Sequence, residues 1–100
     1  MAYRLTIHPL AKNDLVEIST WYENIKKGLG KRFLKSVKKE IAIIKIEPLL
    51  YQIRYDKTRI AVTEYFPYLI HFEVNKNEII IKAIIHPSRN SKVWKNQRNY

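Results

Sequence analysis

The chain has 100 residues, no cysteine, 46% hydrophobic residues and a formal net charge of +10. This length fits a single domain, residues 1–100, and the hydrophobic share is sufficient for a packed core without disulfide or metal staples. The lack of cysteine excludes a disulfide framework and any thiolate metal site, and the three scattered histidines do not suggest a structural zinc. We therefore expect neither a metal nor a cofactor.

The charge balance narrows the class of partner. Nineteen lysines and arginines against nine acidic residues predict an anionic partner, which is nucleic acid, an acidic protein or a membrane surface. No apolar run approaches the roughly 18 residues of a membrane span, and the N-terminal residues lack the apolar core of a signal peptide. We expect a cytoplasmic protein with no membrane partner.

The first half of the sequence predicts a strand followed by a helical hairpin. Residues 3–8 alternate like a strand. A helix begins at Pro9, whose missing N–H is not needed in the first turn, and residues 28–30 separate it from a second helix that stops before Pro48. Each helix has one apolar face: Ala11, Leu15, Ile18, Tyr22 and Ile25 in the first, and Leu29, Phe33, Val37, Ile41 and Ile44 in the second. We expect His8, at the junction of strand and helix, to be structural.

The second half has the two-residue period of strands. Residues 51–55, 59–65, 68–74 and 78–86 predict strands joined by short connections, which is the pattern of an antiparallel meander. The segment 78–86 is almost wholly apolar, as expected of a central strand. The predicted fold class is α+β, with an N-terminal strand and an antiparallel helical hairpin packed on one face of a twisted antiparallel sheet.

Side-chain alternation predicts a cationic sheet face away from the helices. In strand 59–65, Ile60 and Val62 are assigned to the core, and Arg59, Ala61, Thr63 and Tyr65 to the open face. In the last strand, Ile79, Ile81, Ala83 and Ile85 form one row, and Ile80, Lys82, Ile84 and His86 the other. The predicted polar row contains Arg54, Arg59, His71, Lys82 and His86, with Glu73 as its one acid.

This polar row suggests a chemistry. Arginine binds phosphate through two parallel hydrogen bonds, and histidine titrates near neutral pH and moves protons. A base, an acid and cations are the minimum for cleaving RNA through its own 2′-hydroxyl, because the cations stabilise the developing negative charge. The alternative is a solvated polar face without chemistry, which is common in antiparallel sheets.

Two further clusters are basic. Residues 26–39 contain seven cations and no acid, and Lys31, Lys35 and Lys38 lie on one side of the predicted second helix. This side is either a solvated helix face or a binding surface. The segment after His86 adds Arg89, Lys92, Lys95 and Arg98, together with Trp94. Tyr65 suits either the core or a base-stacking surface.

An ordered set of segments resembles the RelE/ParE superfamily of type II toxin–antitoxin toxins. The resemblance covers nearly the whole chain, although each piece alone has little specificity. The matching segments are Leu10–Ile18, Trp21-Tyr22, Gly28–Leu34, Pro48 with Tyr51, Arg59–Ala61, Phe66–Tyr68, and Ile84–Arg89 with Trp94. It implies two helices against a twisted antiparallel sheet, and a cognate antitoxin whose acidic or amphipathic segment wraps the toxin.

The resemblance leaves two targets. RelE-like members are ribosome-dependent mRNA endonucleases, which implies that the ribosome and mRNA are the partners. Carried over to this chain, the resemblance implies that Arg59 and His86 are the catalytic residues and that Arg89 lies in the C-terminal segment that binds RNA. Arg54 and Lys82 are added as RNA-binding residues from their predicted positions alone. ParE-like members poison DNA gyrase without hydrolytic residues.

Two departures from the nuclease pattern bear on this choice. Pro87 stands directly after His86 where a tyrosine is expected, and the strand before Arg59 contains no glutamate base. The cationic open face nevertheless favours the endonuclease slightly over the gyrase inhibitor.

Overall fold

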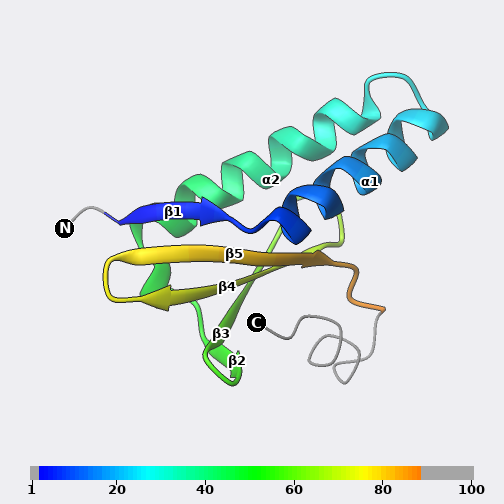
Figure 1. Cartoon of the computed structure of the whole chain (residues 1–100). Helices are drawn as coiled ribbons and strands as arrows, with labels where there is room; N and C mark the ends of the chain where they lie inside the picture. Colours follow the sequence, from blue (N-terminus) through cyan, green and yellow to red (C-terminus); the bar gives the residue numbers. More distant parts are fainter. Residues whose placement is uncertain (1–2, 89–100) are drawn as a thin grey trace.

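The computed structural model describes residues 3–88 and confirms the α+β fold, with both helices on one face of a sheet (Figure 1). The elements in chain order are β1 (Arg4–Ile7), α1 (Pro9–Ile25), α2 (Leu29–Ile46), a short 3-10 turn η1 (Pro48–Leu50), β2 (Ile53–Tyr55), β3 (Thr58–Val62), β4 (Leu69–Asn75) and β5 (Glu78–Ile85). The sheet has five strands in the order β1-β5-β4-β3-β2.

Strands β2 to β5 form the predicted antiparallel meander. β1 pairs with β5 in parallel, with Leu5 opposite Ile79, so the sheet as a whole is mixed. Parallel neighbours need a long connection, and here both helices and three strands lie between them in the chain. β5 thereby has a strand partner on each side.

Local contacts begin both helices where the sequence predicts. His8 is the N-cap of α1, and its Nδ1 accepts a hydrogen bond from the Leu10 N–H at 3.1 Å, with Pro9 in the first turn. The start of α2 is capped across the hairpin, because the carboxylate of Glu23 accepts from the N–H groups of Gly28 at 2.9 Å and Gly30 at 3.0 Å. A negative charge at a helix N-terminus also offsets the helix dipole.

The core lies between the helix pair and the sheet. Its fully buried large side chains include Phe33 and Ile44 of α2 and Ile70, Phe72 and Ile81 of the sheet. An aromatic cluster closes one end, where the rings of Tyr22, Phe33, Phe66 and Tyr68 lie 5.0–6.3 Å apart by their centroids. Edge-on contacts of this kind add to the burial of the rings.

The predicted facing of strand β3 is wrong. Arg59 lies opposite Phe72 and Ala61 opposite Ile70, so Arg59 and Ala61 share the helix-covered face with two core residues. Val62 is 61% exposed on the other face. Ile60, Ala61 and Val62 are apolar in succession, so the sequence pattern does not distinguish the two faces and the pairing with β4 decides.

A β-bulge makes the predicted rows of β5 wrong beyond its middle. His71 and Phe72 are neighbours on β4, but their partners are Ala83 and Ile81, which leaves Lys82 as an extra residue. Because a bulge shifts the alternation by one, Ile84 faces the core opposite Ile70. The row of Ile79 and Ile81 therefore continues with Ile84 and not with Ala83.

We predict that Gly30→Ala destabilises the protein by about 1–3 kcal/mol, the range for overpacking a tight contact. An added Cβ would lie 2.3 Å from the Ser19 carbonyl oxygen, which is backbone of α1 and has no rotamer to escape through. Urea unfolding followed by circular dichroism measures the loss. The control is Lys31→Ala at the next position of α2, where the residue is exposed. An equal loss of stability in both variants would contradict the close approach.

Candidate functional site

The open face, which is the sheet face away from the helices, holds a polar network of Tyr55, Thr58, His71, Glu73 and Lys82. Tyr55 Oη lies 2.8 Å from His71 Nδ1. Lys82 Nζ donates to Thr58 Oγ1 at 2.7 Å, lies 2.9 Å from Glu73 Oε2, and sits 5.5 Å from the centre of the Tyr55 ring.

Two members of this network, His71 and Lys82, are buried. His71 is fully buried and Lys82 is only 6% exposed. The Lys82 ammonium is compensated by a carboxylate, a hydroxyl and an aromatic face, which is how a buried charge is normally held. The two residues that the sequence places on an anion-binding surface therefore lie on the open face, but with their polar groups directed into the protein.

The structure does not bring Arg59 and His86 together. Arg59 donates a hydrogen bond to the Tyr51 carbonyl on the helix side of the sheet. The ring of His86 lies 5.4 Å from that of Tyr68, and its Nδ1 is 2.8 Å from Ser88 Oγ. Arg59 is opposite Phe72, four residues along the chain from Tyr68, so about 13 Å of strand separates the two positions.

The remaining predicted site residues are also scattered. Arg54 is exposed on the edge strand β2, and Arg89 lies outside the described residues 3–88.

Tyr51, whose carbonyl accepts the hydrogen bond from Arg59, is itself held in place, since Tyr51 Oη donates to Glu40 Oε2 at 2.8 Å. Burial and this hydrogen bond raise the pKa of the Tyr51 hydroxyl above its ordinary value.

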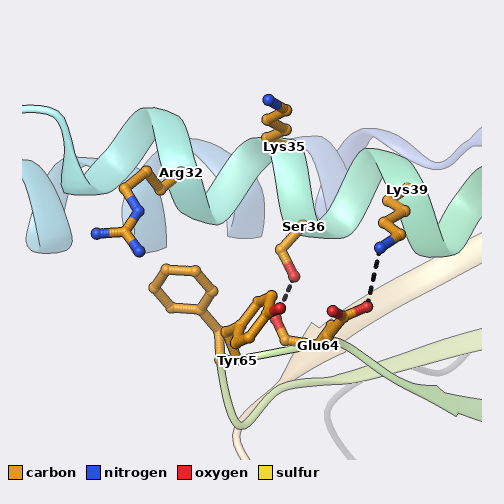
Figure 2. A pocket seen from close by; sticks show the side chains of 7 residues that line it. Arg32, Lys35, Ser36, Lys39, Glu64 and Tyr65 are labelled. Atoms are coloured by element: carbon orange, nitrogen blue, oxygen red, sulfur yellow. Dashed lines mark hydrogen bonds and ion pairs between the residues drawn. The ribbon is translucent and has the colours of Figure 1, made fainter.

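A pocket of about 300 Å³ opens between α2 and the loop 63–68, and sequence analysis does not predict it (Figure 2). We call it the α2 pocket. Its lining residues come from two segments far apart in the chain: Arg32, Lys35, Ser36 and Lys39 from α2, and Glu64, Tyr65 and Phe66 from the loop.

Hydrogen bonds hold the loop in this place. The Ser36 hydroxyl donates to the Glu64 carbonyl, and the Thr63 hydroxyl donates to the Phe66 carbonyl. Tyr65 adopts a left-handed backbone conformation with φ of 71° and is 88% exposed. The strand predicted over 59–65 therefore ends at Val62, and Tyr65 is outside the core.

The electrostatics of the α2 pocket are positive. Lys39 Nζ lies 3.1 Å from Glu64 Oε2. Hydrogen bonds from Lys39 and from the Tyr65 hydroxyl hold the pKa of Glu64 below its usual range, and Glu64 in turn raises the pKa of Lys39. Glu64 is thus ionised and matched by Lys39. Among residues 3–88, neither Arg32 nor Lys35 makes an ion pair with a carboxylate.

Residues 3–88 contain neither a candidate metal centre nor a candidate membrane-spanning helix. Within residues 3–88, histidine, aspartate and glutamate do not gather in groups of three that would hold a metal ion. Neither described helix has the length and apolarity to cross a bilayer.

Two packed helices over a five-stranded sheet, with cations gathered along α2, define a small α+β domain. Residues 5–91 match the family model described as ParE toxin of type II toxin–antitoxin system, parDE. The chain therefore belongs to this family of toxins, whose systems pair each toxin with a cognate antitoxin.

A solved structure has the same fold. The chain is similar to one from the chromosomal ParDE toxin–antitoxin system of P. aeruginosa, with a TM-score of 0.77 and 18% sequence identity over 85% of this chain and 96% of that chain. No curated protein matches the sequence.

We predict that Lys82→Met lowers the free energy of unfolding by about 1–2 kcal/mol, because Thr58 and Glu73 lose a hydrogen-bonding partner. Arg4→Met is the matched control, since the Arg4–Glu78 pair is 3.7 Å apart and its arginine side chain is 79% exposed. Exposed pairs contribute at most about 1 kcal/mol and often nothing measurable. Chemical denaturation of both variants gives the comparison, and equal losses would contradict the structural role of the network.

Proposed function

We propose that this toxin inhibits growth by binding DNA gyrase, without hydrolytic chemistry of its own, and that a cognate antitoxin neutralises it. Membership of the ParE family supports this target, because the ParE-like branch of the superfamily is the one that the sequence resemblance associates with gyrase. The observation that carries the proposal is the separation of Arg59 and His86. In the nuclease, Arg59 would hold the scissile phosphate while His86 moves the proton, so both groups must reach the same substrate.

The mRNA endonuclease is the second candidate, and one observation favours it. His71, Lys82 and Glu73 lie on a single sheet face, which is the set of base, cation and acid that RNA cleavage needs. These groups already bond to Tyr55, Thr58 and one another. An RNA phosphate would have to displace those contacts, and this cost makes the gyrase target the better supported one.

An exposed apolar patch supports binding of an amphipathic antitoxin segment. Ile46, Leu49 and Leu50 line a hollow at the end of α2, together with Tyr3. Ile46 and Leu50 are 75% and 74% exposed. Clustered exposed apolar side chains beside a cationic helix match a segment that carries both apolar and acidic residues.

The target is tested by purified toxin in two parallel assays, gyrase supercoiling and protein synthesis in an extract. We expect inhibited supercoiling with trapped gyrase–DNA cleavage complexes, and unaffected translation. Codon-phased mRNA ends in expressing cells, with gyrase active, would contradict the proposal. Unaffected growth in cells without antitoxin would contradict both candidate functions.

We predict that His86→Ala and Arg59→Met keep full toxicity in cells. A catalytic acid, base or phosphate ligand removed from a nuclease typically costs a hundredfold or more in rate, whereas a binding toxin needs neither group. Growth inhibition after induction is the measurement. Because Arg59 bonds to Tyr51, the thermal midpoint of each variant is compared with that of the unmodified protein, and loss of toxicity in a folded variant would revive the nuclease.

A further inference from the structure

We propose that the α2 pocket binds single-stranded nucleic acid, with one base stacked on Tyr65 and successive phosphates held by Arg32 and Lys35. This goes beyond the proposed function, which requires only contact with gyrase. It also differs from the sequence-based expectation, which places phosphate binding at Arg54, Lys82 and Arg89.

The first support is the ring of Tyr65. Tyr65 is 88% exposed. Its backbone φ of 71° lies in the left-handed region, which tyrosine rarely adopts. Four contacts hold the loop around it. The Ser36 and Thr63 hydroxyls donate to loop carbonyls, Lys39 pairs with Glu64, and the Tyr65 hydroxyl bonds to the Glu64 carboxylate. A strained backbone held by its surroundings is characteristic of functional sites, and here the result is a fixed, solvent-facing aromatic surface.

The second support is the charge beside that ring. Arg32 and Lys35 are three residues apart on α2 and so lie on neighbouring parts of its surface. Figure 2 shows Arg32 extended on the pocket side of the helix and Lys35 directed outward from it. A strand stacked on Tyr65 would have Arg32 on the same side of α2, and it would reach Lys35 by passing over the outer surface of the helix. Arginine donates two parallel hydrogen bonds to a phosphate, and lysine acts as a point charge.

The third support is that the carboxylate of Glu64, which would repel a phosphate, is paired with a cation. Among the described residues that line the pocket, Glu64 is the only one with a carboxylate, and Lys39 pairs with it. The outer surface of α2 continues the positive charge through Lys31 and Lys38, both exposed. An anionic strand therefore meets no uncompensated negative charge between the ring and the helix surface.

The combination of ring and cations favours nucleic acid over an acidic peptide. An acidic peptide needs only the charges, whereas every nucleotide has both a phosphate and a π-face. Base stacking on aromatic side chains and electrostatic contact along the backbone are how proteins bind single strands without sequence preference.

The experiment titrates purified toxin into a fluorescein-labelled mixed-sequence DNA strand of about 12 nucleotides, within the usual site size, and follows anisotropy. We expect Tyr65→Ala to raise the Kd about tenfold and Tyr65→Phe to leave it nearly unchanged, since stacking needs the ring and not the hydroxyl. The double variant Arg32→Ala/Lys35→Ala should flatten the slope of log K against log salt by about 1.4, or about 0.7 per lost phosphate contact.

The matched control is Lys12→Ala/Lys57→Ala, which removes the same charge from exposed positions on α1 and the β2–β3 turn. It should change the salt slope much less. Circular dichroism verifies that each variant is folded. Equal effects of the two double variants, unchanged binding by Tyr65→Ala, or equal affinity for a polyglutamate peptide of the same charge would overturn the proposal. None of these results depends on whether gyrase is the target.

Discussion

The β-bulge at Lys82 determines the arrangement of the sheet on which this protein is built. One extra residue in β5 exchanges the two rows of side chains halfway along the strand. Ile79 and Ile81 face the helices before it and Ile84 faces them after it. Lys82, the extra residue of the bulge, bonds to Thr58 and Glu73 and is only 6% exposed.

The helix pair depends on a second constraint, which is the close approach of α1 and α2 at their connection. Gly30 leaves room for the Ser19 carbonyl, and Glu23 supplies the cap that Gly28 lacks. This fixes the position of α2 over the sheet. Ser36 and Lys39 of the same helix bond to Glu64 in the loop 63–68. The packing of α2 against α1 therefore also affects the position of Tyr65 in this loop.

The cations behind the net charge of +10 fall into two groups, those held by contacts within the fold and those exposed on the surface. Lys82 and Arg59 are engaged within the sheet, and Lys39 is matched by Glu64. Lysines 31, 35 and 38 and Arg32 lie exposed along α2. The exposed cations of α2 thus lie on the same helix as the exposed apolar residue Ile46, which lines the apolar hollow at its end.

The sequence alone determined the α+β class, the bounds of both helices to within a few residues, a structural role for His8 and the family. These depend on local signals: a helical period over about 17 residues, glycines and prolines at the boundaries, and a set of segments in fixed order. The superfamily resemblance is confirmed by the match over residues 5–91. Three features were determined only by the tertiary structure: the facing of β3, the exchange of side-chain rows in β5 and the α2 pocket. Runs such as Ile60–Val62 and Glu78–Ile85 have no alternation to read, so the pairing between strands sets which side chain faces the core. The pocket joins α2 to a loop some 28 residues further along the chain, and no local pattern reports a contact that forms only when the helix packs onto the sheet.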